Sequence, residues 1–66
     1  MQNELFSDKL QIERKLFFFD LKENVRGRFL RITEDVNGRR DAIVIPASGL
    51  REFRDVLTKM LDESPE

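Results

Sequence analysis

The chain has 66 residues and a formal net charge of −1, and it contains neither Cys nor His. Without thiols and imidazoles it has no thiolate nucleophile, no imidazole base and no usual zinc ligand set, so we expect neither catalysis nor a cofactor. A domain this small buries only about 60% of the surface of its unfolded chain. With no disulfide or metal to support it, we expect a second subunit to do so.

The near-neutral total hides a segregated charge distribution. Residues 22–40 carry six basic and three acidic side chains, whereas residues 41–66 carry three basic and six acidic ones. Because salt screens charges over about 8 Å, the local excess matters more than the sum. No apolar run has membrane-spanning length and residues 1–6 lack a signal-peptide pattern, so we expect a cytoplasmic protein, associated with the nucleoid if bacterial.

Two strands are expected in the first third of the chain. Residues 6–12 alternate, with Phe6, Leu10 and Ile12 on one side. Residues 15–22 contain the run LFFFDL, which is dense in strand-forming residues and carries an aromatic side chain on each face. The alternation predicts one amphipathic strand and one strand with two apolar-bearing faces.

Two further strands follow, each after a turn. Residues 23–27 interrupt the pattern as a hairpin loop, and residues 28–34 then alternate cleanly. Asn37-Gly38 is a strong hairpin signal, and residues 41–45 form a fourth strand that Pro46 terminates.

A helix is expected at the C-terminal end. Ser48 is a suitable N-cap, and apolar residues recur at helical spacing from Leu50 to Leu61. Six apolar positions in about three turns form a stripe that is broad for one small sheet to cover. Val56 and Leu61 are therefore expected to reach a partner subunit.

These elements predict an α+β domain, a four-stranded antiparallel sheet followed by one helix, over residues 1–66. Its core spans about residues 5–61, with a short acidic tail at 62–66. The helix is expected to cover one face of the sheet and to leave the other open. The covered face carries Phe17, Phe19, Leu21, Leu30 and Ile32.

The open face would combine aromatic rings with cations, the combination that holds single-stranded nucleic acid. Phe18 and Phe29 lie among Lys22, Arg31 and Lys9. From the pattern alone, Phe18 is more readily explained as a dimer contact, and Phe29 is balanced between the two roles. A protein-interaction module that uses this face or an edge strand stays open as an alternative.

The segments FFFDLKENVRGRFLRITE, residues 17–34, and IVIPASGLREFRDVL, residues 43–57, closely resemble the repeat of the PUR family, the purine-rich element-binding proteins. The resemblance runs from about Leu5 to Met60. It implies a Whirly-like ββββα repeat that binds single-stranded DNA or RNA, preferentially rich in guanine, and that takes part in transcription regulation.

The resemblance also implies site residues. The family's base-contacting Lys, Asn and basic residue fall on Lys22, Asn24 and Arg26, and its stacking aromatic falls on Phe29. With the neighbouring side chains, the candidate nucleic-acid-binding set is Lys22, Asn24, Arg26, Arg28, Phe29, Arg31 and Phe18. Simpler roles compete for four of them. Asn24 suits a turn, Lys22 and Arg26 suit a solvated hairpin tip, and Arg28 suits an ion pair with Glu34 or Asp20.

The chain departs from the family's multi-repeat members in carrying one repeat, as bacterial members do. The resemblance then implies a homodimer, formed through the helix expected at residues 48–62, with no membrane and no small-molecule partner. Where the family places Gln at the end of the first strand, this chain has Glu13. A carboxylate there would repel phosphate, so the expected site does not extend to that position.

Overall fold

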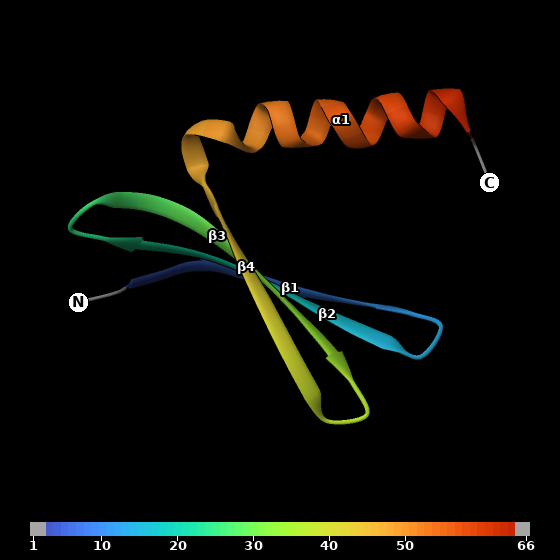
Figure 1. Ribbon diagram of the computed structural model, residues 1–66. Helices are drawn as coiled ribbons and strands as arrows, with labels where there is room; N and C mark the ends of the chain where they lie inside the picture. Colours follow the sequence, from blue (N-terminus) through green and yellow to red (C-terminus); the bar gives the residue numbers. More distant parts are fainter. Residues whose placement is uncertain (1–2, 65–66) are drawn as a thin grey trace.

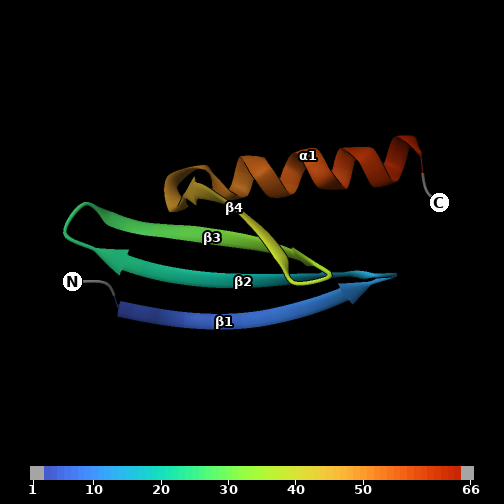
Figure 2. The same ribbon diagram turned by 60° about the horizontal axis from the view of Figure 1, so that its bottom comes forward.

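The computed structural model describes residues 3–64 as a four-stranded sheet followed by a helix. The strands pair antiparallel in the order β1-β2-β3-β4, so the expected ββββα meander is confirmed. Figures 1 and 2 show a strongly twisted sheet with β1 at one edge and β4 at the other. The elements are β1 (Asn3–Ile12), β2 (Lys15–Asn24), β3 (Gly27–Val36), β4 (Arg39–Pro46), the single 3₁₀ turn η1 (Ala47–Gly49) and α1 (Leu50–Glu63).

The strand register sorts the side chains onto two faces, because directly opposed residues of an antiparallel pair share a face. Phe17 pairs with Leu10 and Glu34, and Phe19 pairs with Ile32. We call this side the apolar face. Its apolar members are Phe6, Leu10, Ile12, Phe17, Phe19, Leu21, Leu30, Ile32, Val36, Ile43 and Ile45.

The β3–β4 hairpin is closed by Asn37-Gly38, as predicted. Both residues adopt positive φ, 54° and 83°, which is the signature of the two-residue type I′ turn. Asp35 supports the turn by accepting a hydrogen bond from the Gly38 amide, with 3.1 Å between N and Oδ1. Pro46 ends β4 at the sheet edge, where a residue without an N–H is tolerated.

The helix begins two residues after Ser48, and the prediction of Ser48 as its N-cap is wrong. Gly49 occupies the N-cap position and no side chain caps the helix there, because Ser48 is taken up in η1. No helix within residues 3–64 is long and apolar enough to cross a membrane. The predicted acidic tail is split, since Asp62 and Glu63 belong to α1 and residues 65–66 lie outside the described part.

The helix does not cover the sheet, so the prediction that it covers one face of the sheet is wrong. After η1 it runs away from β4 instead of folding back onto the sheet (Figures 1 and 2). Leu50 at its start is half-buried. Its other apolar residues stay 36% to 65% exposed, and they are Phe53, Val56, Leu57, Met60 and Leu61. The reason is local, since the short η1 connection directs the helix outward and leaves no loop long enough for a return.

One copy of the chain therefore lacks an interior. Among residues 3–64 no side chain is fully buried, and the accessible surface is 5934 Å². A compact monomer of this mass would expose about 4,400 Å². The radius of gyration, 13.4 Å, also exceeds the value of about 11 Å for a compact chain of this length.

Replacing Gly38 by Ala is expected to destabilise the fold by about 1 kcal/mol, because an L-residue disfavours the left-handed region. A Cβ would meet no atom within 4 Å at Gly38, so only the backbone conformation is tested. Urea unfolding at fixed protein concentration measures the loss. Gly38→Asn is the matched control, since Asn adopts the left-handed region more readily than Ala does and meets the same open space. Equal stability of the two variants would contradict the turn assignment.

Candidate nucleic-acid interface

The side of the sheet opposite the apolar face, here called the polar face, carries most of the candidate site. Its residues form rows across the strands, and each row joins partners that the register places opposite one another. From the β2–β3 hairpin outward, the rows are Asn24 with Gly27; Glu4, Lys22, Phe29 and Pro46; Ser7, Asp20, Arg31 and Val44; Lys9, Phe18, Thr33 and Ala42; and Gln11, Leu16, Asp35 and Arg40.

The β2–β3 hairpin is tighter than the five-residue loop expected for residues 23–27. The strands pair up to Asn24 and Gly27, so only Val25 and Arg26 form the tip. Gly27 takes a φ of 123°, a conformation that favours Gly. Val25 is 94% exposed, so the tip of the hairpin stands free in solvent.

Asn24 has the turn-forming role that competed with base contact. Its Oδ1 accepts a hydrogen bond from the Arg26 amide at 2.8 Å, an Asx-type contact that closes the hairpin. The amide nitrogen of the same side chain makes no hydrogen bond within residues 3–64. The turn therefore uses the acceptor of Asn24 and leaves its donors for a ligand.

Lys22 and Phe29 lie directly opposite one another on the polar face, at the base of this hairpin. Arg31 is in the next row, opposite Asp20. The structure thus brings an ammonium, an aromatic ring and a guanidinium together beside the exposed tip that carries Arg26.

Arg28 is placed differently from its neighbours in sequence. The register puts it opposite Glu23 and on the apolar side, away from Lys22 and Phe29. Its Nε lies 3.4 Å from Glu23 Oε2, so it forms an ion pair, although with neither of the two carboxylates considered from the sequence. The period of two separates Arg28 from Phe29, because consecutive strand residues point to opposite faces.

Phe18 lies on the polar face two rows from Phe29. The guanidinium of Arg40, from β4, lies over its ring at 5.1 Å from the centroid, a cation–π distance. Arg40 is itself held by Asp35, with 2.8 Å between Nε and Oδ2. Sequence reasoning did not single out Arg40, since its contact with Phe18 crosses β3 and depends on the register of three strands.

A second contact that the sequence did not indicate joins Ser7 and Asp20. Ser7 Oγ donates a hydrogen bond to Asp20 Oδ1 at 2.6 Å, between β1 and β2. Both residues line a hollow beside β1, together with Asp8, Lys9 and Phe18. Glu13 is remote from it, in the β1–β2 turn at a φ of 56°.

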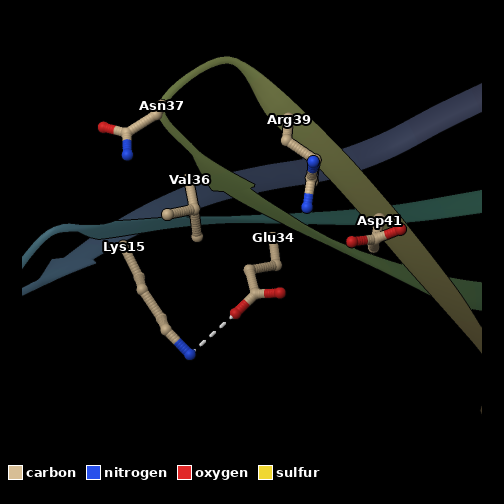
Figure 3. A pocket seen from close by; sticks show the side chains of 6 residues that line it. All are labelled: Lys15, Glu34, Val36, Asn37, Arg39 and Asp41. Atoms are coloured by element: carbon tan, nitrogen blue, oxygen red, sulfur yellow. Dashed lines mark ion pairs between the residues drawn. The ribbon is translucent and has the colours of Figure 1, made fainter.

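Another hollow lies at the far end of the sheet, near the β3–β4 turn. Figure 3 shows Lys15 reaching Glu34, whose carboxylate is 3.0 Å from Nζ, beside Val36, Asn37, Arg39 and Asp41. Cations and carboxylates alternate here without an aromatic ring for stacking. This charged rim borders the apolar face and adds nothing to the polar face.

Comparison with known proteins points to one family. The family model described as "PurA ssDNA and RNA-binding protein" matches residues 1–66. "Transcription factor Pur-alpha 1" of Arabidopsis thaliana is 53% identical over 53 residues, which cover 80% of this chain and 18% of that protein.

Two animal proteins give similar matches. Human "Transcriptional activator protein Pur-alpha" is 46% identical over 66 residues, 89% of this chain and 20% of that protein. "Transcriptional activator plp-1" of Caenorhabditis elegans is 48% identical over 58 residues, 83% of this chain and 26% of that protein. The chain thus spans about a fifth to a quarter of the length of these relatives.

The turn-forming role of Asn24 leads to a stability prediction. Asn24→Ala is expected to destabilise the protein by about 1 kcal/mol, the usual net contribution of one such hydrogen bond. Asn24→Asp keeps the Oδ acceptor and should retain most of the stability. Urea unfolding of both variants at one protein concentration makes the comparison. Equal losses would show that the hydrogen bond to the Arg26 amide contributes little.

Proposed function

Since the chain belongs to the PurA family of single-stranded DNA- and RNA-binding proteins, we propose that it binds single-stranded nucleic acid through the β2–β3 hairpin and the adjoining polar face. The observation that carries the proposal is the placement of Lys22 opposite Phe29, next to the exposed tip. The family is defined by binding and not by catalysis, in agreement with the expectation from composition.

Phosphates and bases would meet different parts of this surface. Arg26 at the tip and Lys22 and Arg31 on the polar face supply charge that follows a phosphate backbone. Phe29 supplies a ring on which a base stacks, an interaction worth about 1 to 3 kcal/mol. The amide N–H groups of Asn24 would donate hydrogen bonds to a base edge, and Arg26 or Lys22 would donate to O6 and N7 of guanine.

The preference for purines is part of the proposal. Guanine offers O6 and N7 as two adjacent acceptors, and basic side chains recognise this pair more often than any other base edge. Purine rings also give a larger stacking surface to Phe29 than pyrimidines do. We expect the preference to be strongest for guanine-rich strands.

We also propose that the protein works as a homodimer. One copy exposes about 1,500 Å² more surface than a compact monomer of its mass, a value obtained from its accessible area of 5934 Å². If each partner buried about this area, the total interface area would lie in the range typical of obligate dimers. The uncovered apolar surfaces are the helix stripe and the apolar face of the sheet.

An exchange of helices would cover both surfaces at once. The stripe on α1 includes Val56 and Leu61, and it would lie on the partner's apolar face around Phe17 and Phe19. Two-fold symmetry makes such an exchange reciprocal. It would also place two β2–β3 hairpins on one particle, so that one strand could engage both with a gain in effective concentration.

The relatives are named as a transcription factor and as transcriptional activators. We propose regulation of transcription as the process served by the binding. A cytoplasmic location, at the nucleoid in a bacterium, fits this role.

Replacing Lys22, Arg26 or Phe29 by Ala should weaken binding of a purine-rich single-stranded oligonucleotide. The loss for Phe29→Ala should be about 1 to 3 kcal/mol, because one stacked base is removed. For Lys22→Ala and Arg26→Ala, the slope of log affinity against log salt should fall by about 0.7 for each phosphate that the variant no longer neutralises. Fluorescence anisotropy at several salt concentrations measures both quantities.

Arg28→Ala is the matched control, since it removes the same charge two residues from Arg26 but from the apolar side of the sheet. It should weaken binding less than Arg26→Ala does. Unchanged affinity in all three test variants would refute the interface. Absence of binding by the unaltered protein, together with co-purification of a protein partner, would favour a protein-interaction module.

The dimer predicts a mass of twice 7.8 kDa in sedimentation equilibrium. It also predicts a melting temperature that rises with protein concentration, because association is coupled to folding. Leu57→Lys should lower the mass or the melting temperature strongly, since Leu57 is part of the apolar stripe. Thr58→Lys, on the polar side of α1, serves as the control. A monomer mass with a concentration-independent melting temperature would exclude the dimer.

A further inference from the structure

Two carboxylates lie on the polar face of the central strands, and their surroundings differ. Asp35 accepts hydrogen bonds from the Gly38 amide and from Arg40 Nε. Asp20 accepts only from Ser7 within residues 3–64, through Oδ1. Arg31 lies opposite it but forms no ion pair with it among these residues. One carboxylate oxygen of Asp20, Oδ2, therefore has no partner in the described part of the chain.

Asp20 occupies the middle of the surface proposed to hold nucleic acid. Its row lies between that of Phe29 and that of Phe18. A carboxylate in this place repels phosphates, so it weakens non-specific binding. It can favour binding only where a base presents hydrogen-bond donors to it, because an ionised carboxylate is purely an acceptor.

Guanine is the base that fits this requirement. Its Watson–Crick edge presents the N1–H and N2–H groups side by side, and these two donors match the two oxygens of a carboxylate. Adenine, cytosine and uracil or thymine each place an acceptor next to their donor on this edge. In single strands the Watson–Crick edge is free to be read. Asp20 would accept both guanine donors, since each carboxylate oxygen has more than one lone pair.

The hollow beside β1 supplies the other contacts that a base needs. Phe18 and Asp20 line it from β2, about 7 Å apart along the strand. Ser7 and Lys9 line it from β1, opposite Asp20 and Phe18 respectively. Arg40, which lies over the ring of Phe18, comes from β4, at the opposite edge of the sheet from β1.

We propose that Phe18, Asp20, Ser7 and Lys9 form a guanine-reading subsite on the polar face, in which Asp20 selects the base. Phe18 provides the stacking surface, Ser7 fixes the carboxylate, and Lys9 contacts the flanking phosphate. The proposal rests on the proposed binding of single strands. Phe18 and Phe29 are offset by four residue positions on adjacent strands, about 14 Å, so the subsite and the hairpin hold different nucleotides of one strand.

The test compares a guanine-rich single-stranded oligonucleotide with the same oligonucleotide carrying inosine, which lacks only the N2 amino group. The unaltered protein should bind the inosine strand about tenfold more weakly, as expected for the removal of one hydrogen bond to a charged group. Asp20→Asn should reduce this ratio to about twofold or less, because its amide presents only one acceptor. Its affinity for the inosine strand should be unchanged or higher, because a negative charge is removed.

Two further variants make the result specific. Asp62→Asn removes the same charge from the polar side of α1 and should keep the full guanine-to-inosine ratio. Phe18→Ala should weaken binding of both strands to a similar extent, because stacking is tolerant of sequence. Far-UV circular dichroism shows that each variant is folded, and retained binding of the inosine strand shows it again for Asp20→Asn and Asp62→Asn.

The outcomes separate this proposal from the one on which it rests. If Asp20→Asn binds both strands with the original ratio, or if the unaltered protein does not distinguish them, the guanine subsite is overturned and the binding function stands. If the unaltered protein binds neither strand at low salt, both proposals fail.

Discussion

The chain has two apolar surfaces, and they do not contact each other within a single copy. One lies on the sheet around Phe17, Phe19 and Ile32, and the other is the apolar stripe of α1. They stay apart because the turn Ala47–Gly49 leads the helix away from the sheet. Removal of apolar surface from water is the main favourable term in folding. The stability of the protein and its proposed association therefore depend on the same interaction, and the proposed exchange of helices would satisfy both.

The same constraint assigns roles to the two faces of the sheet. In a strand, alternate residues point to opposite sides, so the strands that present Phe17, Phe19 and Leu21 for burial present Phe18, Asp20 and Lys22 on the other side. A partner on the apolar face leaves the polar face to a ligand. The proposed binding of nucleic acid and the proposed association would thus use the same strands without competing for surface.

Much of the fold follows from short-range patterns. Asn37-Gly38 indicated the last hairpin, Pro46 the end of β4, and the spacing of Phe53, Val56 and Met60 the helix. These signals are local, so they can be read from neighbouring residues. The candidate site could likewise be predicted from the sequence. The family motif indicates Lys22, Asn24, Arg26 and Phe29, and alternation along the strands places Lys22 and Phe29 on one face.

Tertiary structure decided what depends on direction and register. The amphipathic stripe predicted a helix that packs on an apolar surface, but the helix leaves η1 in a direction that keeps it off the sheet of the same copy (Figures 1 and 2). Strand pairing set Asp20 beside Ser7, Arg40 over Phe18, and Arg28 against Glu23. The sequence by itself determined the elements, the two-sided character of the strands and the family. Which side chains meet across strands is a long-range property, and it became visible only in the assembled sheet.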